Sequence, residues 1–237
     1  MLGNPDIPRE LLLPPPYTAH WLGHGDVFAE AQRLAPDEGA GCLVWQQVDV
    51  TGGPGRFDFA VVLEPDTPLE AARRAFLVGM VAISEALAAH CPPERSVEIR
   101  WPGEILLDRS RLGGMRFASA PETAADQIPD WLVLGVELIA DRDHLTMPGD
   151  RPDSISLKEE EFTDPPAVLE SFCSYLMLNF DRWKHDGFEA IARRYDERVV
   201  TEGVLTDLGD LVVDGDQTSL AAMVAQPHWR DDIGPKL

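Results

Sequence analysis

The residues best suited to chemistry lie between positions 98 and 116, where arginines, an acid, a Trp-Pro pair and adjacent glycines follow one another. Arg100-Trp101-Pro102 is followed directly by Gly103-Glu104, and Arg111-Leu112-Gly113-Gly114 comes shortly afterwards. A planar guanidinium group holds a carboxylate or a phosphate through two parallel hydrogen bonds. The side chains of this block therefore suit the binding of an anion, with Glu104 as the acid among them.

The block resembles the signature of the biotin and lipoate protein ligases. In that family a basic residue and Trp-Pro end one strand, an Asn-Asp pair follows, and Lys-Leu-Ala-Gly or Lys-Leu-Ser-Gly opens the next strand. Arg100-Trp101-Pro102 matches the first part, Gly103-Glu104 takes the Asn-Asp place, and Arg111-Leu112-Gly113-Gly114 takes the lysine place, without a gap. An arginine thus stands where the family has its catalytic lysine, so the block indicates the family's fold and pocket while questioning its reaction.

The resemblance also implies a set of site residues. It gives Arg111 and Glu104 the catalytic positions, and an arginine would anchor the carboxylate of a bound acid. The further ligand-binding positions implied in the same way are Arg56, Gln47, Trp101, Gly103, Gly113, Gly114 and Arg116. The resemblance alone supplies ATP and biotin or lipoate as ligands, a biotinyl or lipoyl carrier domain as protein partner, and compatibility with a homodimer.

Three departures from the family pattern bear on the reaction. Adenylation of a carboxylate builds negative charge, which the compact lysine ammonium stabilises in the family, whereas Arg111 is larger and planar. Glu104 is one methylene longer than the aspartate it replaces, and Ile139 stands where the family has a nucleotide-side asparagine. The glycine-rich loop over 51–56 is short and has Arg56 as its one arginine.

Three functions stay open on these residues. The first is a ligase-like protein that binds a small carboxylic acid and retains weak ligase or acyl-transfer activity. The second is a non-catalytic sensor or carrier of the same fold that recognises a small acid or a lipoylated or biotinylated domain. The third is a purely structural interaction protein. These residues alone therefore leave open whether the chain is an enzyme.

The elements that must position this block form an α+β pattern, with strands clustered rather than strictly alternating with helices. We expect a mixed sheet backed by two long helices, the first with Thr67 as N-cap and a capping box closed by Glu70. The predicted elements are a helix over 25–35, strands over 42–48 and 57–63, a helix over 68–89, strands over 97–101, 104–108, 113–118 and 131–139, helices over 166–183 and 188–199, a hairpin over 204–213 and a short helix over 220–224. Residues 1–200, with an extended arm at the start, make the ligase-like domain, and 201–237 make a small hairpin and helix appendage.

Charge and composition narrow the function further. The net charge of −21 repels nucleic acid and anionic membranes. There is no apolar run of about 18 residues that would cross a membrane, and the start of the sequence does not read as a signal peptide. The three cysteines are far apart, and His20 and His24 lack a third metal ligand, so we expect reduced thiols and no metal site. This acidic, lysine-poor composition predicts a cytoplasmic bacterial protein.

Overall fold

A seven-stranded mixed sheet organises the protein, whose computed structural model describes residues 9–48, 53–147, 149 and 151–237. The strand order is β1-β2-β3-β7-β6-β5-β4, with β1 parallel to β2 and all other neighbours antiparallel. The strands are β1 (Thr18–Trp21), β2 (Cys42–Val48), β3 (Gly55–Leu63), β4 (Val97–Arg100), β5 (Glu104–Leu107), β6 (Ser110–Ser119) and β7 (Leu132–Asp141). The predicted α+β class with a mixed sheet is confirmed.

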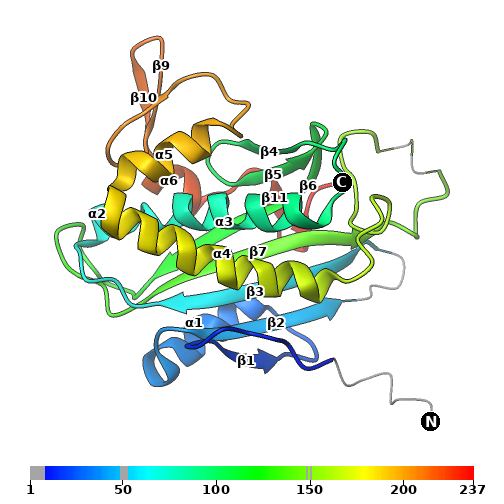
Figure 1. The fold of residues 1–237 in the computed structure, drawn as a ribbon, viewed down its shortest axis with the longest axis horizontal. Helices are drawn as coiled ribbons and strands as arrows, with labels where there is room; N and C mark the ends of the chain where they lie inside the picture. The colour runs from blue at the N-terminus through cyan, green and yellow to red at the C-terminus, as the bar shows by residue number, and fades with distance from the viewer. Residues whose placement is uncertain (1–8, 49–52, 148, 150) are drawn as a thin grey trace.

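Helices cover both faces of this sheet, with the two long ones on the same face (Figure 1). The helices are α1 (Val27–Glu38), α2 (Leu69–Ala72), α3 (Ala75–His90), α4 (Pro165–Asp186), α5 (Phe188–Asp196) and α6 (Leu220–Ala225). α3 is buried along most of its length because it is apolar on nearly every side, and α4 packs on it. α1 carries one apolar face and packs on β2, β3 and β7 from the opposite side.

The core follows from alternation along the strands. Phe57, Phe59 and Val61 of β3 are fully buried among the side chains of α3 and α4. Ala60 and Val62 point the other way and join the cluster under α1. Because successive strand residues face opposite sides, the sheet has two apolar faces and both need helices.

The predicted helix over 68–89 is wrong as a single element. It divides into α2 and α3, and Thr67 does not cap it. The first amides of α2 instead donate to backbone carbonyls of a distant loop, Leu69 N to Gln127 O at 2.8 Å and Glu70 N to Ala125 O at 2.9 Å. Tertiary contact has replaced the local capping box.

Asp164 stands at the N-cap position of α4 but does not cap it with its side chain. Its side chain makes no capping bond to α4, and its carboxylate binds the guanidinium of Arg9 at 3.1 Å. The Asp164 carboxylate therefore accepts from Arg9 of the N-terminal arm instead of from the first amides of α4.

Four short strands of the described chain lie beyond the prediction. β1 adds an edge strand, and a small sheet combines β8 (Val204–Leu205) and β9 (Leu211–Val213) with the unpredicted β10 (Asp216–Thr218). A last hairpin joins β11 (Arg230–Asp231) to β12 (Gly234–Pro235). Leu220 and Val224 of α6 pack in the main core. The division of the chain at residue 200 stays a prediction.

In Figure 1 the described chain begins near β1, at one edge of the sheet, and ends near β6. The C-terminal hairpin runs back behind β5 and β6. Residues 227–236, which we call the C-terminal segment, contact β6 and β7 through β12. Among the described residues there is no helix that is both long and apolar enough to cross a membrane. The start of the glycine-rich loop, at 51 and 52, lies outside the described residues.

Candidate functional site

A row of polar residues crosses the sheet at one register level. Gln46, Asp58, Glu137, Gly114 and Glu104 are successive partners on β2, β3, β7, β6 and β5. Side chains of directly paired residues point to the same face of a sheet. The ring of a phenylalanine on α1 covers Gly135, two positions before Glu137, so the row lies on the face that α1 covers in part.

Glu104 ends this row on β5 and pairs with Arg111 of the neighbouring β6. Glu104 is fully buried, and its Oε1 accepts a hydrogen bond from Arg111 Nε at 2.7 Å. Its Oε2 lies 2.8 Å from Arg100 Nη1 and 3.6 Å from His228 Nε2. The two residues to which the family resemblance gave the catalytic positions are therefore in direct contact. Two guanidinium groups on one carboxylate leave one positive charge in excess at this point.

Glu137 is the second buried acid of the row. It pairs with Arg116 Nη1 at 2.9 Å and with Arg230 Nε at 3.0 Å. Arg116 also stacks on the ring of Phe28, with its guanidinium carbon 4.1 Å from the ring centroid, and binds Asp26 at 3.1 Å. Burial raises the pKa of Asp26, but the Arg116 charge and the amides that Asp26 caps hold it below its usual range.

Asp58 is the third acid, and it stands between two phenylalanines of β3. Burial raises its pKa to about 6, against the opposing effect of the nearby Arg56 charge. Gln46 Nε2 and Arg56 Nε both donate to Asp58 Oδ2, at 3.2 and 3.1 Å. Arg56 also donates to the carbonyl of Ile233. Above about pH 6 this carboxylate is ionised and neutralises Arg56.

The glycines of the block make room for packing. A Cβ on Gly114 would overlap the indole of Trp229, and one on Gly103 would overlap the ring of Phe76. A Cβ on Gly113 would overlap the carbonyl of Glu137 on the neighbouring strand, so that glycine serves strand packing. Of these three positions, Gly114 faces Trp229 over the row, whereas Gly103 packs on Phe76 of the main core.

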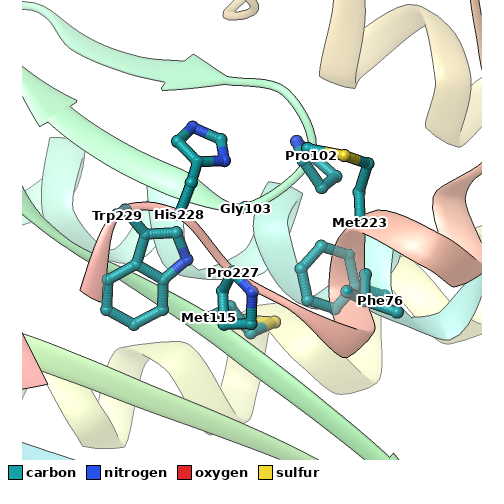
Figure 2. Close-up of a pocket in the computed structure, with 9 residues that line it drawn as sticks. Phe76, Pro102, Gly103, Met115, Met223, Pro227, His228 and Trp229 are labelled. Atoms are coloured by element: carbon teal, nitrogen blue, oxygen red, sulfur yellow. The ribbon is translucent and has the colours of Figure 1, made fainter. Parts of the chain in front are cut away.

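A small cavity remains beside Trp229 (Figure 2). Its volume is about 10 Å³. It is lined by Phe76, Pro102, Gly103, Met115, Met223, Val224, Pro227, His228 and Trp229. His228 belongs both to this cavity and to the surroundings of Glu104. An apolar wall therefore adjoins the charged group, which is the usual composition of a small-molecule site.

Two predicted site residues lie elsewhere. Trp101 is buried in the main core, and its indole Nε1 donates to the carbonyl of Gly209 at 3.3 Å. Gln47 is exposed near the end of β2, whereas its neighbour Gln46 is fully buried in the polar row. The glutamine chosen from the sequence was thus one position away from the one that faces the site.

Sequence reasoning also missed Asp58, Glu137 and the C-terminal segment. Each of the two acids is the lone charge within a predicted apolar strand, over 57–63 and 131–139, and buried acids almost always have partners, so this signal was available. His228, Trp229 and Arg230 follow one another near the end of the chain. Nothing in their spacing predicts a contact with strands that precede them by about ninety residues or more.

The cysteines take no part in the site. Cys173 is buried in the core, and burial raises the pKa of its thiol. Burial likewise raises the pKa of Cys42 to about 11. No cluster of His, Cys, Asp or Glu that could hold a metal occurs among the residues that the structure describes.

The chain also matches a known protein family. The model of the Biotin/lipoate A/B protein ligase family matches residues 13–197. Because that match spans well over half of the chain, the chain belongs to this family.

Individual relatives agree with this assignment. The biotin–[acetyl-CoA-carboxylase] ligase of Paracoccus denitrificans is 29% identical over 168 residues, which are 66% of this chain and 68% of that protein. A biotin protein ligase-like protein of unknown function from a Silicibacter species is 26% identical, with a TM-score of 0.73 over 88% of this chain and 96% of that one. The biotin protein ligase of Aquifex aeolicus in complex with biotin and ATP has a TM-score of 0.62 at 16% identity, over 84% of this chain and 94% of that one. At that identity the likeness concerns the fold alone.

The charges at the row decide which ligands of the family fit. Five guanidinium groups face four carboxylates there: Arg56, Arg100, Arg111, Arg116 and Arg230 against Asp26, Asp58, Glu104 and Glu137. The residues outside the described part of the chain contain no lysine or arginine. A polyanionic triphosphate therefore finds an excess of only one positive charge along the row as a whole. A single carboxylate would match the local excess at Glu104, so these charges suit one carboxylate better than a triphosphate.

Proposed function

We propose that this protein binds a biotin- or lipoate-like carboxylic acid at the Arg111–Glu104 pair, with little or no adenylating activity. The observation that carries the proposal is the environment of Arg111. Its side chain is only 16% exposed, its Nε is bound to Glu104, and its Nη1 donates to the backbone carbonyl of Lys236 at 3.3 Å. A carboxylate is a stronger acceptor than this neutral carbonyl.

The charge balance supports the same ligand class. Arg100 and Arg111 share the single carboxylate of Glu104, so one negative charge from a ligand would neutralise the group. The apolar wall beside it, with Phe76 and Met115, suits the hydrocarbon part of such an acid. These two features meet at Gly103, next to Glu104 in the chain.

The same argument favours a free acid over an acid already joined to a carrier domain. Attachment of biotin or lipoate to a lysine converts the carboxylate to an amide, which has no charge. Arg111 would then lose the charged hydrogen bond that distinguishes a carboxylate from the carbonyl it already has. Recognition of a modified carrier domain is thus the weaker alternative.

Substitution of Arg111 tests the proposal. Arg111→Ala should weaken the binding of biotin or lipoic acid by roughly 1.5–3 kcal/mol, the range for a hydrogen bond to a charged group. Arg111→Lys should keep the charge without the planar fork and recover part of the affinity. Isothermal titration of both acids against the wild-type chain and the two variants measures the effect.

Arg33→Ala is the matched control, because Arg33 is 64% exposed on α1 and, among the described residues, pairs with its helical neighbour Glu30 alone. It should bind either acid like the wild type. Equal affinity of the wild type and Arg111→Ala for both acids would show that Arg111 is structural and would refute the proposed site.

A further inference from the structure

The C-terminal segment fills the space in which the proposed site would hold its ligand. The indole of Trp229 is 1% exposed and lies on Gly114 of the polar row, between Glu104 and Glu137. On one side of it His228 approaches Glu104, and on the other Arg230 binds Glu137. Three consecutive residues thus contact three consecutive strands, β5, β6 and β7, at one register level.

The remainder of the segment contacts the other charged site residues. The carbonyl of Lys236 accepts from Arg111, and the carbonyl of Ile233 accepts from Arg56. Arg111, Glu104, Arg56, Gly103 and Gly114 therefore all face this one segment. Backbone carbonyls of the chain occupy donors of the two arginines best placed to hold an acid.

The way in which the segment is attached makes it displaceable. Its backbone pairs with itself, through the β11–β12 hairpin and a bond from Lys236 N to Trp229 O at 3.0 Å. Within the described parts of the chain, no backbone–backbone hydrogen bond joins it to the seven-stranded sheet. Side-chain contacts and the burial of Trp229 hold it in place, so it can leave without breaking a strand pairing.

The cavity left under the segment is too small for the acid. Its volume of about 10 Å³ is that of one water molecule. Small-molecule sites are typically about 300–1,000 Å³. An acid of the size of biotin can therefore reach Gly103 and Gly114 only after Trp229 has moved away.

We propose that residues 227–236 are a built-in plug of the acid site, which the ligand must displace. The inference rests on the proposed function, because it assigns a means of regulation to the same site. While the plug is closed, the indole and the two backbone carbonyls stand in for the ligand. The apparent affinity for the acid is then the intrinsic affinity reduced by the fraction of open molecules.

Weakening the plug in the full-length chain tests this inference. Trp229→Ala should bind biotin or lipoic acid at least about tenfold more tightly than the wild type, as expected when the closed form exceeds about nine-tenths of the population. Arg230→Gln, which removes the charge opposite Glu137 without opening a hole, should shift affinity in the same direction by less. Asp232→Ala, in the exposed turn of the hairpin, should bind like the wild type. Thermal unfolding of each variant establishes that it is folded at the titration temperature.

The outcomes separate the plug from the site. Binding of an acid with equal affinity by the wild type, Trp229→Ala and Arg230→Gln would overturn the plug and leave the acid site standing. Binding of neither acid by any of the chains would overturn the proposed function and the plug with it. Tighter binding by both variants supports both.

Trypsin supplies a second reading on the unmodified chain. Arg230 is held against Glu137, with its side chain only 18% exposed, so cleavage after it should be slow without ligand. Saturating biotin or lipoic acid should speed that cleavage by releasing the segment, and it should leave cleavage after the exposed Arg33 unchanged. Cleavage after Arg230 that stays constant or slows when the acid is bound contradicts displacement.

Discussion

Exchange of pyrophosphate into ATP, driven by biotin or lipoate, is expected to run roughly 10²–10³-fold slower with this protein than with an ordinary ligase of the family. The reason is that position 111 carries an arginine in place of the compact lysine ammonium of the family. Arg111 Nε already donates to Glu104, and Arg111 Nη1 donates to the carbonyl of Lys236. A lost transition-state contact of about 3–4 kcal/mol corresponds to that factor. The excess of only one guanidinium group over the carboxylates along the row points the same way.

The exchange assay needs both a reference and an internal control. A biotin protein ligase measured at the same enzyme and substrate concentrations supplies the reference rate. Arg111→Lys supplies the control, since a gain of activity there would identify this position as the main defect. Wild-type exchange at an ordinary ligase rate with either acid would show that arginine suffices and that the charge argument fails.

Removal of the Glu104 carboxylate is expected to lower the stability of the protein strongly. Glu104→Ala should lower the free energy of unfolding by about 3–5 kcal/mol, because it leaves two guanidinium groups, one of them mostly buried, without their carboxylate. Glu104→Gln should cost less, since its amide oxygen can still accept from Arg111. Urea unfolding followed by circular dichroism measures both.

A surface glutamate provides the comparison. Glu94→Ala changes an exposed residue in the turn before β4 and should stay within about 0.5 kcal/mol of the wild type. A loss below about 1 kcal/mol for Glu104→Ala would mean that Arg111 and Arg100 find water when the acid is gone. The site would then be more open than the full burial of Glu104 indicates.

The local parts of this fold were predictable from the sequence, because they follow from periodicity. The continuous apolar pattern after residue 75 predicts a buried helix, and α3 is that helix, although its start was misplaced. The predicted helix also included α2, whose first amides donate to carbonyls of a loop nearly sixty residues later. No local pattern contains that information.

The site was predictable where the chain itself brings residues together. Glu104 and Arg111 lie on β5 and β6, a hairpin with a short turn, so sequence spacing places them side by side. Gln46 was missed through an error of one in strand phase, although Phe57 and Phe59 in the core require Asp58 and its partner on the other face. A phase error of one moves a side chain to the opposite face of a sheet.

The C-terminal segment was not predictable from the sequence. Its hold on the sheet comes from Trp229 on Gly114 and Arg230 on Glu137, contacts made across about ninety residues or more of chain. A tryptophan near the end of a chain has many possible burial sites. Only the assembled sheet, with Gly114 in its polar row, leaves room for the indole of Trp229.

A crystal structure of the full-length chain grown with biotin or lipoic acid tests the central claim most directly, since it locates the carboxylate. The account predicts a carboxylate oxygen within hydrogen-bond distance of Arg111 Nη1, where the carbonyl of Lys236 now accepts, with Trp229 moved off Gly114. An acid bound away from Arg111, or one bound while Trp229 still covers Gly114, would contradict it.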